Sequence, residues 1–310
     1  MTAPMKVLIT GCNGQLGQAL LAAIPEGMEV IPLRRDGVDL ANASACRQVV
    51  REHQPDWLLN AAAYTAVDRA ESEPDLALRV NGEAPGAFAE TLAETGGHLL
   101  QISTDFVFNG QQGSPYRPDQ SRDPLGVYGA SKAEGERRVM EALPPDRFCL
   151  LRTSWVYGPV GQNFCLTMLR LHRQKAAAGE SLGVIADQVG CPTATHTLAS
   201  ACWRVIQRNI HGIHHWSDAG AASWYDFAVA IGELAVAQGV LATAAQVLPI
   251  GTENYPTPAR RPSYSLLDCR STRTVLELAP LHWREALAQV LARLPASCLL
   301  YTSPSPRDRG

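Results

Sequence analysis

The sequence predicts an α/β fold in which a doubly wound parallel sheet carries a smaller C-terminal α/β lobe. Short apolar runs alternate with helical patterns of ten or more residues through the first half of the chain, which indicates parallel βαβ units. The runs are almost continuously apolar, as in a sheet covered on both faces. The expected strands are 6–10, 29–33, 57–60, 98–103 and 148–154, with a short extra strand that ends at Asp39, and the expected helices are 15–24, 43–53, 75–95 and 128–142.

The regular alternation weakens after about Gly158, and this change predicts the second lobe. A helical pattern covers 161–174 and a strand-like run covers 212–218. A second helix is expected from Ser223, because Asp226 stands three residues later in the spacing of a capping box.

The boundary between the lobes is expected near residue 156. We predict a sheet domain over 5–156, to which some later segments return, and a mainly substrate-binding lobe over 157–297. Residues 298–310 do not continue the helical pattern before them, and Cys298–Asp308 match the translation of a common sequencing adapter. We interpret this tail as a disordered artefact.

The bulk composition is that of a soluble globular protein. Hydrophobic residues make up 46% and charged residues 18% of the 310 residues, and the net charge is −3. A slightly acidic chain is not expected to bind nucleic acid, and no apolar run is long enough for a transmembrane helix. The eight cysteines are scattered without a C-x-x-C pair, which favours reduced, mostly structural thiols. The start "MTAPMKVLIT" leads almost directly into an expected strand and leaves no room for a signal peptide, so a cytoplasmic location is expected.

A glycine-rich loop follows the first expected strand and opens the first helix. In "ITGCNGQLGQAL", Gly11, Gly14 and Gly17 form a G-x-x-G-x-x-G pattern, with Asn13, Gln15 and Leu16 between them. Glycines let the backbone turn tightly and approach a pyrophosphate, which then lies on the N–H groups at the start of the helix. The position after the first strand favours a dinucleotide-binding Rossmann domain over a purely structural turn.

The end of the second expected strand bears on the choice of cofactor. An acidic residue there would hold the 2′-hydroxyl of NAD, but Arg34 and Arg35 occupy the place and suit the 2′-phosphate of NADP. NADP is therefore favoured and NAD stays an alternative, since surface arginines are common in this chain. Asp39 and Leu40 are expected beside the adenine, and Ala61, Ala62 and Ala63 offer small side chains beside the cofactor.

Tyr128 and Lys132 stand four residues apart in a helical pattern and so share one helix face. Free tyrosine has a pKa of about 10, and a nearby ammonium stabilises the phenolate and lowers that pKa. Thr104 ends an expected strand upstream, where its hydroxyl can bond a substrate carbonyl. The glycine loop, Thr104 and the Tyr-Lys pair together predict hydride-transfer chemistry.

Seven stretches between residue 6 and about residue 270 resemble the extended short-chain dehydrogenase/reductase family. They are "GCNGQLGQ", "NAAAYTAVDRAE", "STDFVFNG", "PLGVYGASKAEGE", "LRTSWVYGPVGQNF", "DQVGCPT" and "RRPSYSLLD". The glycine loop and the Tyr-Lys motif are common to that superfamily, whereas "NAAAYTAVD" and "LRTSWVYG…NF" are typical of a subgroup that reduces nucleotide-linked sugars. The resemblance implies reduction of the C4 ketone of a dTDP-linked sugar, dTDP-4-dehydro-L-rhamnose, by NADPH or NADH.

The resemblance also implies roles for individual residues. Tyr128 would protonate the C4 alkoxide, Lys132 would tune Tyr128 and bind the ribose, and Thr104 would polarise the carbonyl. Related dehydratases have a glutamate after the aspartate of "STD", but this chain has Phe106 after Asp105, which favours simple reduction over elimination. The remaining residues expected near the substrate are Asp105, Phe106, Trp155, Asn163 and Arg261.

No metal site is expected. Some members of the subgroup bind Mg²⁺ through glutamates at a dimer interface, but "ATHTLAS" after "GCPT" lacks a glutamate. His211, His214 and His215 lie close in sequence, yet strand alternation would divide them between two faces. A homodimer is left open.

Two further interpretations stay open. The chain also resembles other reductases or epimerases of nucleotide sugars, and the regulatory subunit of methionine adenosyltransferase, which binds a partner and does not catalyse.

Overall fold

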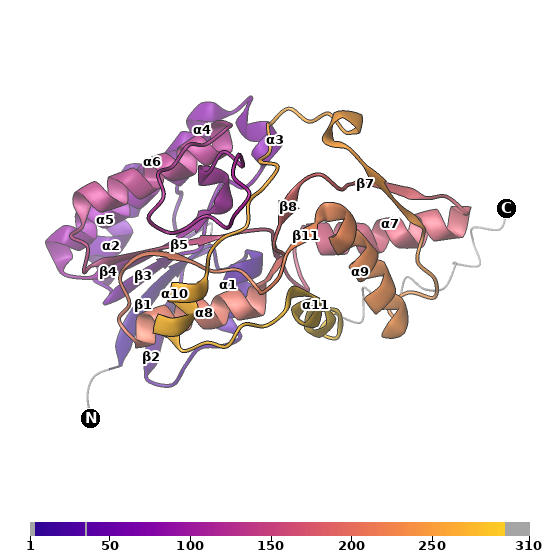
Figure 1. Cartoon of the computed structure of the whole chain (residues 1–310). Coiled ribbons are helices and arrows are strands. Elements are labelled where there is room, and N and C mark those ends of the chain that lie inside the picture. The colour runs from indigo at the N-terminus through magenta and orange to yellow at the C-terminus, as the bar shows by residue number, and fades with distance from the viewer. Residues whose placement is uncertain (1–3, 35, 295–310) are drawn as a thin grey trace.

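A six-stranded parallel sheet forms the centre of the fold, which we describe from a computed structural model for residues 4–34 and 36–294 (Figure 1). The strand order is β10-β5-β4-β3-β1-β2, and every neighbouring pair is parallel. The strands are β1 (Met5–Thr10), β2 (Met28–Pro32), β3 (Trp57–Asn60), β4 (His98–Thr104), β5 (Phe148–Thr153) and β10 (Gly212–His215). The chain runs outward from β1 in both directions, so the predicted doubly wound fold is confirmed, and the switch point lies between β1 and β3.

Helices cover both faces of this sheet (Figure 1). One layer consists of α2 (Ala43–His53), α5 (Ala84–Thr95) and α6 (Val127–Ala142), and the other of α1 (Gln15–Leu21), α8 (Thr195–Gln207) and α10 (Arg270–Leu276). Side chains alternate between the two layers along each strand, since Leu8 packs with the first layer while Val7 and Ile9 pack with the second. This double cover explains the nearly continuous apolar strands.

Two local expectations differ from the structure. The helix expected over 75–95 consists of α4 (Pro74–Leu78), a π-helical turn η1 (Arg79–Glu83) and α5. The short strand expected to end at Asp39 is absent from the described residues 36–42, which form turns. Gly37 N–H bonds the carbonyl of Arg34 at 2.9 Å, and this local bond replaces a strand pairing.

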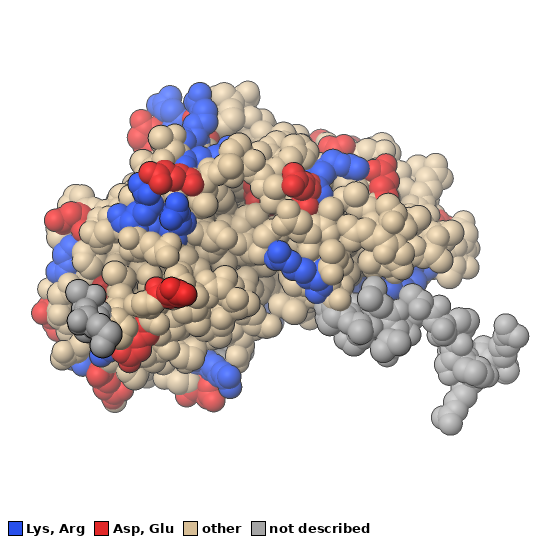
Figure 2. Space-filling view, turned by 90° about the horizontal axis from the view of Figure 1, so that it is seen from below, with Lys and Arg blue, Asp and Glu red and all other residues tan. Residues whose placement is uncertain are grey.

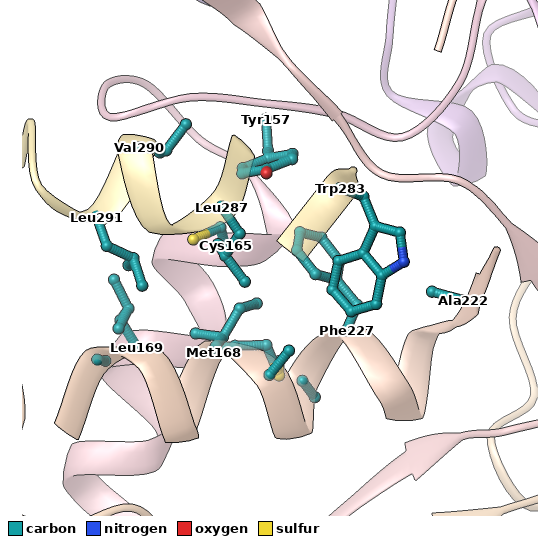
Figure 3. Close-up of a cluster of buried hydrophobic side chains, with 14 of the residues drawn as sticks. Tyr157, Cys165, Met168, Leu169, Ala222, Phe227, Trp283, Leu287, Val290 and Leu291 are labelled. Carbon is teal, nitrogen blue, oxygen red and sulfur yellow. The ribbon is translucent and has the colours of Figure 1, made fainter. Parts of the chain in front are cut away.

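The second lobe has its own core, built from α7 (Phe164–Ala178), α9 (Trp224–Ala237) and α11 (Trp283–Leu291) (Figure 3). Tyr157, Phe227 and Trp283 meet edge to face at its centre, with ring centroids 5.0 and 6.0 Å from that of Phe227. The capping box of Ser223 and Asp226 at the start of α9 is confirmed. Three short pairings complete the lobe: β6 (Val156–Tyr157) with β9 (Thr193–Ala194), β7 (Leu182–Ile185) with β12 (Val247–Ile250), and β8 (Val189–Gly190) with β11 (Ala222–Ser223).

Several segments after residue 156 belong to the central sheet domain. β10 pairs with β5 at the sheet edge, and α8 and α10 pack under the sheet. The remaining short elements are α3 (Val67–Ala70), η2 (Asp105–Val107) and η3 (Thr252–Asn254). The tail 298–310 interpreted as an artefact lies outside the described residues.

The surface carries both signs of charge. Figure 2 shows lysine and arginine side chains interspersed with aspartate and glutamate on the face seen from below. Among the described residues, no helix is both long and apolar enough to cross a membrane.

Candidate active site

The glycine loop lies at the carboxyl end of β1 and packs against the loop after β3. Gly11 has φ +72°, and a Cβ there would lie 2.8 Å from the backbone nitrogen of Ala62. A Cβ on Gly17 would lie 2.2 Å from the carbonyl oxygen of Gly11. Only glycine fits at these two positions, and the loop is thereby brought onto the Ala61–Ala63 segment. No side chain caps the start of α1 at Gly14. This backbone cradle fits a dinucleotide pyrophosphate.

The other residues of the loop point in different directions. Asn13 is exposed, and Leu16 is buried among the apolar side chains under the sheet. Gln15 reaches out to the second lobe, where its Oε1 accepts a bond of 2.7 Å from Asn163 Nδ2. Gln15 Nε2 also donates to the carbonyl of Gln162 at 3.2 Å. The glycine loop is therefore joined directly to the start of α7.

The residues expected around the adenine lie beyond β2. Arg34 is exposed, and Arg35 lies outside the described residues. Asp39 is exposed, and its Oδ1 accepts a bond of 2.9 Å from the N–H of Ala41. Leu40 is half-buried against the layer of α2 and α5.

α6 brings Tyr128 and Lys132 to the carboxyl end of β4. Its first N–H, that of Val127, donates to Glu71 Oε1 at 2.9 Å. A Cβ on Gly129 would lie 2.3 Å from the carbonyl oxygen of Phe106, so the helix sits directly on η2. The rings of Tyr128 and Phe106 meet edge to face with centroids 5.5 Å apart. The sequence therefore places the tyrosine beside the end of β4 through a glycine contact.

The pKa of Tyr128 is raised to about 12, because burial of the phenol outweighs a hydrogen bond with Thr104, and Asp105 adds to the rise. This direction is opposite to the lowering expected from a neighbouring lysine. Lys132 Nζ instead donates to the carbonyl of Ile102 at 2.6 Å. Burial lowers the pKa of Lys132 to about 8, against the opposing effect of Glu136.

Thr104 and Asp105 connect the end of β4 with η2. Thr104 Oγ1 accepts from the N–H of Phe106 at 3.2 Å and donates to Asp105 Oδ1 at 3.0 Å. Asp105 is 2% exposed, and burial raises the pKa of its carboxyl to about 6 in spite of hydrogen bonds from Ser265 and Thr104. Its Oδ2 atom has no bonding partner among the described residues. A buried carboxyl with one unpaired oxygen therefore lies close enough to Tyr128 to act on its pKa.

Trp155 stands at the junction of the two lobes with a left-handed backbone, φ 47°. Its ring stacks on that of Trp224 with centroids 3.5 Å apart and planes within 7°. A bulky residue in this region of φ and ψ is strained and persists only where packing holds it. The stack with Trp224 therefore fixes the orientation of the Trp155 ring.

Asn163 and Arg261 use their side chains within the protein. Asn163 Oδ1 caps α7 through the N–H of Leu166 at 2.9 Å, while its Nδ2 donates to Gln15. Arg261 Nη2 donates to Asp68 Oδ2 at 2.8 Å. This ion pair fastens the C-terminal segment to α3.

Three contributors to the site were not found from the sequence. Trp224 and Ser265 reach it from segments far along the chain and carry no local motif.

The third, Gln101, lies in a buried chain of hydrogen bonds across the sheet. Thr10 Oγ1 donates to Asn60 Oδ1 at 2.5 Å, Asn60 Nδ2 to Gln101 Oε1 at 2.7 Å, and Gln101 Nε2 to the carbonyl of Ile102 at 2.7 Å. Strand alternation was the one available signal, since Asn60 and Gln101 are polar within apolar runs.

The arrangement can combine a dinucleotide cradle with a neutral phenol and a hydroxyl at one sheet edge. A phenol whose pKa is about 12 keeps its proton near neutrality and can give it to an oxyanion. Within the described part of the chain, no three His, Cys, Asp or Glu side chains gather to hold a metal ion.

The chain is similar to known proteins over nearly its whole length. The family described as RmlD substrate binding domain matches residues 5–295. A dTDP-4-dehydrorhamnose reductase of Aggregatibacter actinomycetemcomitans is 38% identical over 93% of this chain and 98% of its own. The spore coat polysaccharide biosynthesis protein SpsK of Bacillus subtilis is 41% identical over 94% of this chain and 99% of its own. The crystal structure of a Bacillus anthracis dTDP-4-dehydrorhamnose reductase in complex with NADP has a TM-score of 0.85 and 34% identity, covering 93% of this chain and 99% of that one.

Proposed function

The chain belongs to the RmlD substrate binding domain family, and we propose that it reduces the C4 ketone of dTDP-4-dehydro-L-rhamnose to dTDP-L-rhamnose. One observation carries this proposal. Tyr128, Lys132 and Thr104 meet at the carboxyl end of β4, in the same sheet edge as the Gly11–Gly17 loop. This arrangement supports the assignment of Tyr128 as proton donor and Thr104 as carbonyl partner beside the glycine loop.

The chain is an oxidoreductase that uses NADP. Its glycine loop would hold the pyrophosphate and its Ala61–Ala63 segment would lie along the cofactor. Arg34 and Arg35 would face the 2′-phosphate, with Asp39 and Leu40 near the adenine. NADPH supplies the hydride when it is bound.

The proton comes from Tyr128. As negative charge develops on the C4 oxygen of the sugar, the phenol gives it a proton and the phenolate is left behind. The Lys132 ammonium would stabilise that phenolate and hold the ribose, and it takes no proton itself. The Thr104 hydroxyl would turn its single proton from Asp105 Oδ1 to the carbonyl oxygen and so fix the sugar for the transfer.

Phe106 limits the chemistry to reduction. Its ring lies against Tyr128 and has no titratable group, so it cannot remove a proton from the sugar. Asp105, Trp155, Asn163 and Arg261 would complete the substrate side. The stacked Trp155 and Trp224 rings support a role in walling off the sugar nucleotide.

The test is NADPH oxidation with dTDP-4-dehydro-L-rhamnose made in situ. We expect turnover by the wild type and a loss of about 100-fold or more in kcat for Tyr128→Phe, because the proton donor is gone. Tyr255→Phe is the matched control, since Tyr255 is 58% exposed. The proposal would be wrong if the wild type did not turn over, and the role of Tyr128 would be wrong if Tyr128→Phe were as active as the control.

A further inference from the structure

A buried ion pair involves α6, the helix that carries Tyr128 and Lys132. Glu136 on α6 and Arg152 on β5 are joined by two bonds, from Nε to Oε1 at 2.8 Å and from Nη2 to Oε2 at 2.7 Å. Their side chains are 0% and 2% exposed. A buried ion pair adds little stability compared with apolar side chains of equal volume. We therefore look for a role of this pair other than stability.

The Glu136 carboxylate is bonded on every side. Oε1 also accepts from Ser103 Oγ at 2.6 Å, and Oε2 lies 3.5 Å from Arg122 Nη1. Ser103 stands between Ile102, whose carbonyl takes Lys132, and Thr104. The Glu136 carboxylate is therefore bonded to Ser103, the residue between Ile102, which accepts from Lys132, and Thr104.

Arg152 is fixed in the same way. Its Nη1 donates to the carbonyl of Pro118 at 3.1 Å and to His215 Nε2 at 3.3 Å, and its guanidinium lies over the ring of Phe108. With these contacts the guanidinium cannot move toward Lys132, and it holds the carboxylate in one orientation.

Lys132 needs a counter-charge. It is 4% exposed, and the hydrogen bond described for its ammonium goes to a neutral carbonyl. A buried ammonium with only such a partner is costly. Glu136 follows Lys132 by one helical turn, in the spacing that puts two side chains on the same face. The charged or titratable groups around this cluster are Tyr128 and Glu136 on α6, Asp105 on η2, Arg152 on β5, His215 on β10 and Arg122 in the preceding loop.

We propose that Glu136 is a positioning residue, the counter-ion that keeps Lys132 charged and seated on the carbonyl of Ile102 while Tyr128 transfers its proton. Arg152 and Arg122 also pair with the Glu136 carboxylate, and their positive charges weaken its electrostatic attraction to the Lys132 ammonium. The inference rests on the proposed reductase function for its catalytic meaning. The electrostatic part does not depend on that function, because buried Glu136 stands one helical turn after buried Lys132 on the same face of α6 whether or not a ligand is bound.

Glu136→Gln tests the idea because it keeps the shape and removes the charge. A unit charge at this spacing is worth on the order of one pH unit. We expect the alkaline limb of the pH profile of kcat/KM to begin about one unit lower than in the wild type. Glu136→Asp should restore the wild-type limb even if it melts earlier, since the charge is kept. Glu134→Gln is the control on the same helix, because Glu134 pairs with Arg137 and Arg138 at the surface.

Nuclear magnetic resonance separates this inference from the reductase assay. The chain has three lysines, Lys6, Lys132 and Lys175, so lysine labelled with ¹³C at Cε gives three signals that titrate without substrate. Glu136→Gln should lower the pKa of Lys132 by about one unit. An unchanged Lys132 titration would overturn the inference, whatever sugar the enzyme accepts.

Arg122→Gln is the second variant, in case Glu136→Gln does not fold. Arg122 is 25% exposed, so its loss should be tolerated. It leaves Glu136 with one cation fewer, so the pKa of Lys132 should rise, in the opposite direction to Glu136→Gln. A fall or no change in this variant would also overturn the inference.

Discussion

At the scale of single residues, His215 shows how a buried contact fixes a protonation state. The ring is fully buried, with Nδ1 at 3.0 Å from the carbonyl of Tyr116 and Nε2 at 3.3 Å from Arg152 Nη1. Arginine can only donate, so Nε2 must accept and the single ring proton lies on Nδ1. Burial and the neighbouring Arg152 lower the pKa of His215 to about 3.

His215→Gln should make the protein less sensitive to acid. The folded pKa lies below the unfolded value of 6.5, so the unfolded chain binds a proton that the folded chain refuses as pH falls below 6.5. Between pH 7 and pH 5 the wild type should lose about 2 kcal/mol of unfolding free energy through this residue. Glutamine keeps one donor and one acceptor without titrating.

Denaturant unfolding at pH 7 and at pH 5 measures this difference. The other histidines are common to both proteins, so their contributions cancel when the variant is compared with the wild type. An equal loss of stability in the two proteins would contradict the neutral state of His215.

The same scale shows what sequence can say about a site. The glycine loop and the pair of Tyr128 and Lys132 were predicted, because each is a local motif whose residues stand within a few positions of one another. Trp224 and Ser265 were not, since each meets its partner, Trp155 or Asp105, only after the chain has folded back. The rise of the Tyr128 pKa was also missed, because burial cannot be read from an i,i+4 pair.

At the scale of elements, α6 is held by close backbone contacts. A Cβ on Gly135 would lie 2.1 Å from the carbonyl oxygen of Asn81, so α6 rests directly on the π-helical turn η1. Asn81 Nδ2 also bonds Ser131 Oγ at 3.1 Å. Through these contacts the turn after α4 determines where Tyr128 and Lys132 stand.

Gly135→Ala should therefore be harmful, although alanine normally favours a helix by about 1 kcal/mol over glycine. The added methyl has no space against backbone, so we expect a loss of about 2–3 kcal/mol in unfolding free energy and a fall in kcat. Gly86→Ala is the comparison variant on α5, because its Cβ would lie 3.1 Å from Cβ and Cδ of Arg138, a contact that a shift of a few tenths of an ångström relieves. Thermal melting and the NADPH assay measure both effects. If the Gly135→Ala variant were as stable and as active as Gly86→Ala, the contact between α6 and η1 would not determine the position of α6.

The order of strands and helices in the first half could be predicted, because apolar periodicity follows directly from burial on a two-sided sheet. The π-helical turn could not, since it depends on how α4 and α6 meet. The expected strand at Asp39 was wrong because a local bond between Gly37 and Arg34 forms a turn there.

At the scale of the whole molecule, the chain crosses repeatedly between two lobes. β10, α8 and α10 lie with the central sheet, although they follow the first segments of the second lobe in sequence (Figure 1). The sequence predicted the second lobe from a loss of regularity, which does not reveal which later segments return to the sheet. Pairing of β10 with β5 is a contact between distant segments and carries no local signal.

A direct contact between the lobes joins the glycine loop to the start of α7. Gln15 of the glycine loop bonds Asn163, and Asn163 in turn caps α7 in the second lobe. Gly161 approaches the same glutamine, with a notional Cβ 2.9 Å from Gln15 Cγ. The glycine loop therefore supports the start of α7, the first helix of the second lobe.

Asn163→Asp tests whether this contact matters for the substrate. Aspartate keeps the oxygen that caps α7 but loses the Nδ2 donor to Gln15 and to the carbonyls of Gly158 and Val160, so thermal melting of the variant is measured beside the KM. We expect the KM for the sugar nucleotide to rise several-fold, because the hydrogen bond between Asn163 and Gln15, which is worth about 1 kcal/mol, is lost. Gln15→Ala, which removes the other partner, should raise the same KM, and the double variant should be no worse than the poorer single one. Additive effects of the two changes on the sugar-nucleotide KM, or no effect at all, would mean that the lobes are aligned without the bond between Gln15 and Asn163.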